Sequence, residues 1–128
     1  LMPGLPGLLR SPGARRLALA GSVAHPERVP PAAAIRIVTA YAQAPGFVAA
    51  SDAMRAGRFV GGDAVRVPVT LAWCEHDRLI ARPRALSFPA REIVLADCGH
   101  VPMYDDPAAV ARVVLEGSAE PALAAASR

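Results

Sequence analysis

The chain has no lysine, no asparagine, only two cysteines and only six aromatic residues among its 128 residues. All fourteen basic residues are arginines and alanine occurs 28 times, which is the bias expected of a GC-rich genome because lysine and asparagine codons are AT-rich. The arginines are scattered among eleven acidic residues, and the net charge is only +3. Proteins that bind nucleic acids present a clustered basic face with aromatic stacking partners. This composition therefore argues against a nucleic-acid partner.

Two cysteines, Cys74 and Cys98, are too few for a disulfide framework or a cysteine-based metal cluster. No apolar run approaches the roughly 18 residues that a membrane span requires. Residues 1–9 are apolar, but they lack a basic leader and are broken by proline and glycine, so they do not resemble a secretory signal. We expect a reduced, cytoplasmic, globular protein, without a membrane partner, a metal site or a cofactor. The chain begins with Leu1, which leaves open an unusual start codon or a longer reading frame.

Residues 10–60 have the pattern of amphipathic helices separated by helix breakers. Pro30 and Pro31 precede a predicted helix over 32–44, and proline is best tolerated at a helix start. A second helix is predicted over 47–56, with Gly57 as a left-handed cap. This part of the chain shows no strand pattern.

The pattern changes after residue 62, where two short β-rich runs appear. We predict strands over 65–73 and 93–96, and neither alternates cleanly, as is typical of strands buried in a parallel sheet. Pro68 stands near the start of the first strand, where proline is tolerated. The connection between them leaves room for only a short helix, over 82–88.

The last helix is predicted over 108–116, with Asp105 and Asp106 as caps and Gly117 as its end. Strands that alternate with helices indicate an α/β fold with a parallel sheet. Two parallel strands cannot cover both faces and both edges of a sheet. We therefore predict an α/β fold with an incomplete parallel sheet of about two strands.

Titratable residues follow the two predicted strands at similar distances. Asp77 lies four residues after the first strand and His100 four residues after the second. Reactive groups gather beyond the carboxyl ends of parallel strands, so these two side chains should lie close enough to hydrogen-bond. A carboxylate on one imidazole nitrogen fixes the tautomer and leaves the other nitrogen free as a general base.

Further motifs surround these two residues in a recognisable order. Val67-Pro68-Val69 opens the first strand, Gly99-His100-Val101-Pro102 carries the histidine, and Asp106-Pro107 opens the last helix. In order and spacing, residues 64–117 resemble the C-terminal part of the α/β-hydrolase fold family. Residues 10–60 are more distantly similar to the helical lid that such enzymes insert before these strands.

The resemblance implies that Asp77 is the triad acid and His100 the general base, with an intermediate formed on a serine or, in some relatives, an aspartate. In this family the serine nucleophile occupies G-x-S-x-G between a strand and a helix. None of the six serines has this context; Ser22 in Ala20-Gly21-Ser22-Val23-Ala24 comes nearest but lacks the flanking glycines in register. The oxyanion loop is also missing, and Cys74 stands where the acid turn of the family usually has glycine.

Other residues compete for these roles. Glu75 and Asp97 are alternative acids, which we expect to be solvated, and His25 and His76 are expected to be exposed loop residues. Cys98 is close to His100 in sequence, but its place in the histidine turn argues against a cysteine nucleophile. Free, buried thiols are the expected state of both cysteines.

The leading hypothesis is an incomplete α/β hydrolase with a helical lid over 1–62, the C-terminal part of the core over 63–117 and a flexible tail over 118–128. The intact enzyme would hydrolyse a small apolar, ester-like substrate, whereas this chain alone would be inactive. The alternative is a truncated, non-enzymatic product that binds a partner, or a second copy of itself, through an open sheet edge.

Overall fold

The computed structural model describes residues 4–57 and 59–125, with side chains through residue 119. By their contacts the residues group into two compact units. Unit 1 consists of residues 1–20 and 26–61, and unit 2 of residues 21–25 and 62–128. The chain therefore enters unit 2 briefly at Gly21, returns to unit 1 at Pro26 and enters unit 2 again at Gly62.

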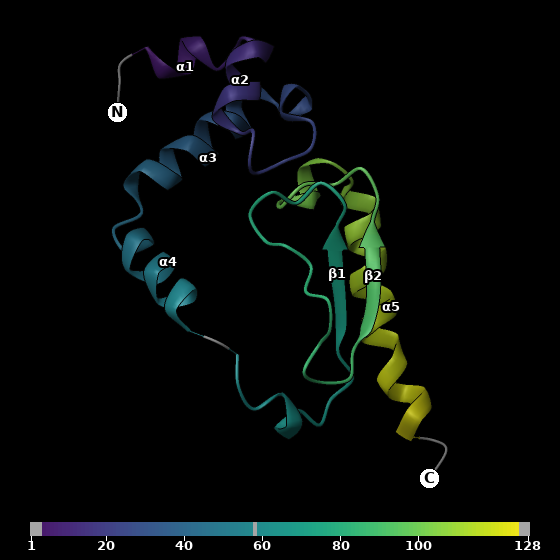
Figure 1. Ribbon diagram of the computed structural model, residues 1–128. Helices are drawn as coiled ribbons and strands as arrows, with labels where there is room; N and C mark the ends of the chain where they lie inside the picture. Colours follow the sequence, from purple (N-terminus) through teal and green to yellow (C-terminus); the bar gives the residue numbers. More distant parts are fainter. Residues whose placement is uncertain (1–3, 58, 126–128) are drawn as a thin grey trace. The chain divides into compact units, whose positions relative to one another are not determined.

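Unit 1 is helical (Figure 1). Its elements are α1 (Leu5–Leu8), α2 (Pro12–Ala18), the 3₁₀ turn η1 (Pro26–Arg28), α3 (Pro31–Gln43) and α4 (Phe47–Ala56). Proline occupies the first turn of α1, α2 and α3, where its missing N–H leaves no hydrogen bond unmade. The predicted left-handed cap at Gly57 is wrong, because Gly57 has a φ of −84°. Its amide instead donates to the Ala53 carbonyl at 2.9 Å.

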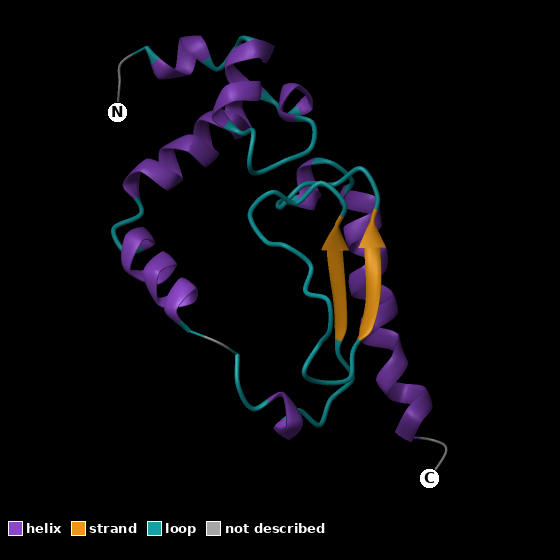
Figure 2. Ribbon diagram, viewed as in Figure 1, coloured by secondary structure: helices purple, strands orange, loops and turns teal. Residues whose placement is uncertain are grey.

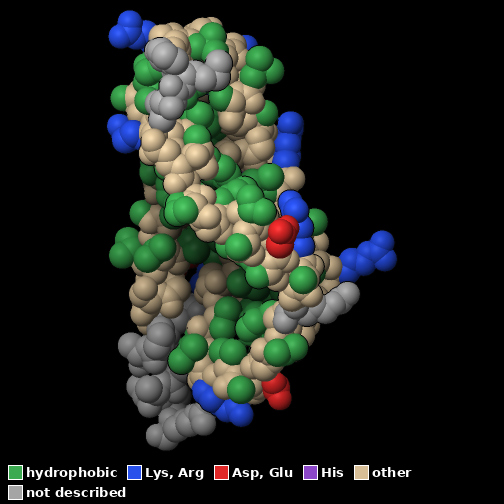
Figure 3. Space-filling view, turned by 90° about the vertical axis from the view of Figure 1, so that its left-hand side faces the viewer, with side chains coloured by type: hydrophobic (Ala, Val, Ile, Leu, Met, Phe, Trp, Pro, Cys, Tyr) green, Lys and Arg blue, Asp and Glu red, His purple; other side chains and the backbone are tan. Residues whose placement is uncertain are grey.

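The core of unit 1 is small. Its buried side chains are those of Leu9, Leu19, Pro26, Val29, Ala33 and Ala34, together with Arg15. Helix α4 contributes no buried residue, and its Phe47, Val48 and Met54 side chains are exposed. Apolar side chains are widely exposed on the face drawn in Figure 3.

Unit 2 contains two parallel strands, β1 (Thr70–Cys74) and β2 (Arg91–Leu95), which point the same way in Figure 2. They pair in register from Thr70 opposite Arg91 to Cys74 opposite Leu95. The prediction of an α/β fold with an incomplete parallel sheet of about two strands is therefore confirmed. Two 3₁₀ turns, η2 (Gly62–Ala64) and η3 (Pro102–Tyr104), precede β1 and follow β2.

The first strand is shorter than its sequence pattern predicts, because β1 begins at Thr70 and not at Val65. The Val65 amide is already used in a turn with the Gly62 carbonyl, at 3.2 Å. Pro68 has no N–H to donate to a ladder. The predicted helix over 82–88 is also wrong, since this stretch is a loop. Prolines 83 and 89 interrupt and follow it, and each disfavours the helical conformation before it.

Helix α5 (Pro107–Ala125) runs along one face of the sheet (Figure 2). Its contact with the sheet is the core of unit 2, in which Leu95, Cys98 and Ala109 are buried and Cys74, Val110 and Val113 pack against them. The predicted end at Gly117 is wrong, because alanines at 119, 122, 124 and 125 are strong helix formers and carry the helix onward. The last part of the predicted flexible tail, residues 126–128, lies outside the described residues.

Candidate functional site

Asp77 is held in a tight turn directly after β1. Its amide donates to the Cys74 carbonyl at 3.2 Å. One carboxylate oxygen, Oδ1, accepts from the amides of Leu79 at 2.8 Å and Ile80 at 3.0 Å. This Asx-type arrangement occupies one oxygen with the main chain and fixes the direction of the other.

The second oxygen of Asp77 contacts the histidine that follows β2. Asp77 Oδ2 lies 3.0 Å from His100 Nδ1, and the two side chains are 14% and 33% exposed. The predicted contact between these two side chains is therefore present. Because an ionised carboxylate can only accept, Nδ1 must carry the proton, which leaves Nε2 with a free lone pair. An imidazole in this tautomer can take a proton at Nε2 while the carboxylate stabilises the resulting cation.

The electrostatics of the Asp77 carboxyl favour its charged form. Desolvation by partial burial raises its pKa, but hydrogen bonds from Ile80, His100 and Leu79 outweigh this effect. The pKa of Asp77 is consequently lowered from its ordinary value. The carboxylate is thus ionised at neutral pH, as its contact with the histidine ring requires.

The turn that carries His100 is held by main-chain contacts from two directions. The Cys98 carbonyl accepts from the His76 amide at 2.9 Å, which joins the histidine turn to the acid turn. On its other side, the Val101 amide donates to the Ser22 carbonyl at 2.7 Å. Gly99 sits so close to this segment that a Cβ on it would lie 2.6 Å from the Ala24 nitrogen. The segment 21–25 therefore packs directly on the turn that presents the imidazole.

The sequence pattern missed both this segment and the acid that binds it. Residues 1–62 were predicted to form one helical lid segment, yet 21–25 belong to unit 2. Asp106 caps α5 as predicted, since its Oδ1 accepts from the Ala109 amide at 2.8 Å. Asp105 was predicted to share that role, but its carboxylate accepts main-chain hydrogen bonds from Gly99, Ala24 and His25. Gly21 and the His25–Pro26 pair are local breakers that could have marked the segment as an exception.

The rival acids form a separate cluster beside the pair. Asp97 Oδ2 lies 2.7 Å from His25 Nε2, and its Oδ1 lies 3.5 Å from His76 Nε2. Glu75 Oε2 accepts from the Asp97 amide at 2.9 Å, and Asp97 adopts a positive φ of 55°. His25 lies in a loop as expected, but the expectation that it is exposed is wrong, because its ring is only 22% exposed. Among the described residues, His100 is hydrogen-bonded by Asp77 and not by Glu75 or Asp97.

The described residues place no nucleophile against the imidazole, since no serine or cysteine side chain in that part of the chain hydrogen-bonds His100. Both cysteines are free thiols; Cys98 is buried as expected, whereas Cys74 is only partly buried and so differs from the expectation. Burial and the negative charge of Asp105 raise the pKa of the Cys98 thiol, and burial also raises the pKa of Cys74. A raised thiol pKa disfavours the reactive thiolate, which weakens Cys98 as a nucleophile.

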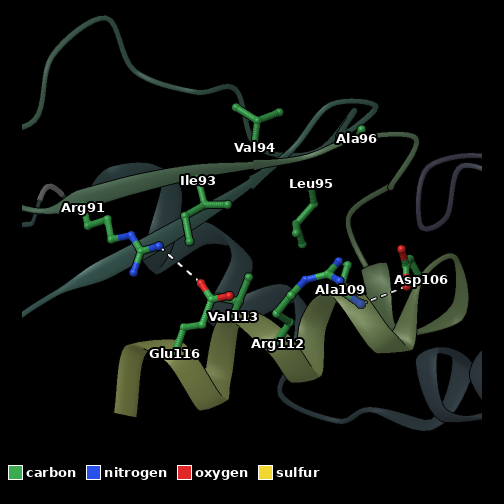
Figure 4. A pocket seen from close by; sticks show the side chains of 10 residues that line it. All are labelled: Arg91, Ile93, Val94, Leu95, Ala96, Asp106, Ala109, Arg112, Val113 and Glu116. Atoms are coloured by element: carbon green, nitrogen blue, oxygen red, sulfur yellow. Dashed lines mark hydrogen bonds and ion pairs between the residues drawn. The ribbon is translucent and has the colours of Figure 1, made fainter. Parts of the chain in front are cut away.

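A groove of about 330 Å³ lies between β2 and α5 (Figure 4). Its lining residues are Arg91, Ile93, Val94, Leu95, Ala96, Asp106, Ala109, Arg112, Val113 and Glu116. Ile93 and Leu95 point toward α5, whereas Val94 points away from it. An ion pair of 3.2 Å between Arg91 and Glu116 connects the strand to the helix. Neither Asp77 nor His100 lines this groove, so it is not a substrate pocket for the pair.

Within residues 4–57 and 59–125, no group of three or more histidine, cysteine, aspartate or glutamate side chains is placed to hold a metal ion. None of the helices described is both long and apolar enough to span a membrane.

Comparison with known proteins identifies the family of the chain. A family model described as "Alpha/beta hydrolase family" matches residues 1–113. Neither the curated proteins nor the solved structures gave a match. The family match covers most of the chain, including both strands and the Asp77–His100 pair. The chain therefore belongs to the alpha/beta hydrolase family.

Proposed function

We propose that Asp77 and His100 are the acid and the general base of a hydrolytic triad, and that this chain does not itself supply the nucleophile. The observation that carries the proposal is the 3.0 Å contact between His100 Nδ1 and Asp77 Oδ2 beyond the carboxyl ends of two parallel strands. Membership of the alpha/beta hydrolase family supports it. The substrate class that we assign is a small, apolar, ester-like molecule.

Each group has a defined part in the proposed reaction. The hydroxyl of a nucleophile attacks the substrate carbonyl while His100 Nε2 removes its proton, and the imidazolium then returns this proton to the leaving group. Asp77 holds the ring and stabilises the imidazolium. Water repeats the sequence to release the acyl group. A chain without a nucleophile and an oxyanion hole lacks the groups that contribute most to the rate of such catalysis.

The isolated chain is therefore expected to show neither a burst nor turnover with p-nitrophenyl esters. Its rate should equal that of a His100→Ala variant, since a lone imidazole base adds little beyond what buffer provides. The measurement is p-nitrophenolate release followed by stopped-flow absorbance. The proposed inactivity would be contradicted if the isolated chain showed robust turnover and the His100→Ala substitution abolished it.

The acid and base roles themselves are tested in the reading frame upstream of the Leu1 codon. If that frame encodes G-x-S-x-G between a strand and a helix, the extended protein should hydrolyse p-nitrophenyl esters. His100→Ala should then lower kcat by about 10³- to 10⁴-fold or more, and Asp77→Ala by a similar order. An active extended protein that tolerates both substitutions would refute the triad.

A second proposal, a non-enzymatic one, rests on the open edge of β1. The Val69 carbonyl accepts from the Arg91 amide and the Glu75 amide donates to the Leu95 carbonyl, so odd-numbered residues of β1 face β2. The main-chain groups of Thr70 and Ala72 consequently point to the other side, where the described residues place no strand. Such an edge favours pairing with another strand. We propose that a second copy of the chain pairs there.

The substitution Ala72→Pro should convert the proposed dimer to a monomer. Proline removes an outward N–H without removing a bond to β2, and edge strands tolerate it on that side. Ala72→Val keeps the N–H and serves as the matched control that should remain dimeric. The measurement is light scattering across a concentration series. A wild-type chain that is monomeric throughout would rule out the second proposal.

A further inference from the structure

Asp105 is an acidic residue whose carboxylate accepts hydrogen bonds from main-chain amides of two separate segments. It lies between η3 and α5. Its Oδ2 accepts from the amides of Gly99 and Ala24, each at 2.9 Å, and its Oδ1 accepts from the His25 amide at 3.0 Å. Hydrogen bonds to an ionised carboxylate are shorter and stronger than those between neutral groups. One side chain therefore satisfies three main-chain donors at once.

These three bonds join the histidine turn to the segment 21–25. Gly99 is the residue directly before His100, so its amide and the imidazole share one short turn. The Val101–Ser22 hydrogen bond, at 2.7 Å, closes the contact on the other side of His100. The same segment also contacts Asp97, two residues after the end of β2, through His25 Nε2 and Asp97 Oδ2 at 2.7 Å. The main chain on either side of His100 is thereby held against segment 21–25.

We propose that Asp105 is a positioning residue for His100. It holds the histidine turn in the position in which His100 Nδ1 contacts Asp77 Oδ2. Asp105 acts on the imidazole through the Gly99 amide, which donates to its carboxylate. Its effect on the Asp77–His100 contact can be measured without turnover, and only its importance for catalysis rests on the proposed function.

The neighbouring carboxylate provides a matched control. Asp106 is adjacent in sequence and also accepts a main-chain hydrogen bond, but its partner is the Ala109 amide inside α5. Asp105→Asn replaces one acceptor oxygen with an NH₂ group, which cannot accept from the amides that face it. At least one of the three bonds is then lost, and the charge with it. Asp106→Asn removes the same charge and leaves the histidine turn unchanged.

The experiment uses NMR on the ¹⁵N-labelled full chain. The readout is the ring Nδ1–H resonance of His100, which the hydrogen bond to Asp77 moves downfield and which Asp77→Ala identifies by its disappearance. We expect Asp105→Asn to move this resonance upfield or broaden it beyond detection. Asp106→Asn should leave it in place, although both variants lower the melting temperature. A ¹³C titration should also show the pKa of the Asp77 carboxyl rising toward its ordinary value in Asp105→Asn only.

A resonance that is unchanged in a folded Asp105→Asn chain would overturn the positioning role. If that variant does not fold, Asp105→Glu decides, because it keeps the charge and both oxygens but moves them by one methylene group. A shifted or weakened resonance in Asp105→Glu supports the proposal, and one identical to wild type overturns it. Failure of the proposed function looks different: an active extended protein would then tolerate His100→Ala and Asp77→Ala, while the resonance and its response to Asp105→Asn would stay as described.

Discussion

Replacing Gly99 with alanine is expected to destabilise unit 2 by about 3 kcal/mol and to separate His100 from Asp77. A Cβ at this position would lie 2.6 Å from the Ala24 nitrogen and 2.6 Å from the Val23 carbonyl carbon. Both are main-chain atoms, which cannot rotate aside as a flexible side chain would. The turn must therefore move away from segment 21–25, and the hydrogen bond from the Gly99 amide to Asp105 is strained in the same step.

The measurement is urea unfolding followed by circular dichroism, together with the Nδ1–H resonance of His100. Gly117→Ala is the control, because a Cβ there would lie at an ordinary 3.5 Å from Thr70 Oγ1. Inside α5 this substitution should stabilise the chain by up to about 1 kcal/mol through helix propensity. Equal and small effects of the two substitutions would show that segment 21–25 does not press on the histidine turn.

The second large effect is expected in unit 1, where Arg15 is a buried cation whose hydrogen-bond partners among the described residues are main-chain oxygens. It is 6% exposed, and its guanidinium donates to the carbonyls of Leu9, Arg10 and Glu27 at 2.9, 2.7 and 2.9 Å. Its Nε is buried and has no hydrogen-bond partner within residues 4–57 and 59–119. Arg15→Met keeps much of the apolar volume but leaves three carbonyls without these donors. Removing the buried charge offsets part of this cost, so we expect a loss of about 2–4 kcal/mol in the free energy of unfolding.

The residue next to it supplies the control. Arg16 pairs with Glu27 at 3.3 Å, but its side chain is 65% exposed. Surface ion pairs contribute about 0–1 kcal/mol, so Arg16→Met should cost less than about 1 kcal/mol. Chemical denaturation of both variants gives the comparison. If Arg15→Met were as mild as Arg16→Met, the three carbonyls would have to find water or other donors at little cost.

The parts of the site that the sequence predicted correctly depend on short-range patterns. Two β-rich runs, each followed at the same distance by a titratable residue, were enough to predict the contact between Asp77 and His100. The contact follows because parallel strands bring their carboxyl ends to one edge. The family could also be recognised, since its motifs in residues 64–117 are local.

The parts that it predicted wrongly depend on competition between local preference and distant contacts. Glycine is common at helix ends, so Gly117 was predicted to end the last helix, but the alanines around it favour continuation of the helix. Val65 and its neighbours have the composition of a strand, but the strand starts only where β2 offers partners, at Thr70. Pro107 marks Asp106 as the residue that caps α5, but no local pattern shows what Asp105 binds. The role of Asp105 is set by segment 21–25, about 80 positions earlier in the sequence, whose amides donate to its carboxylate.

The excursion of residues 21–25 into unit 2 has a consequence for dividing the gene. A piece of the gene that starts at the Gly62 codon would encode Asp77, His100 and Asp105 in full. It would omit the peptide groups of Ala24 and His25, so Asp105 would retain a single amide donor, that of Gly99. Dividing the gene at the Gly62 codon would thus remove two of the three amides that hold the Asp105 carboxylate, and with them part of the contacts that position His100.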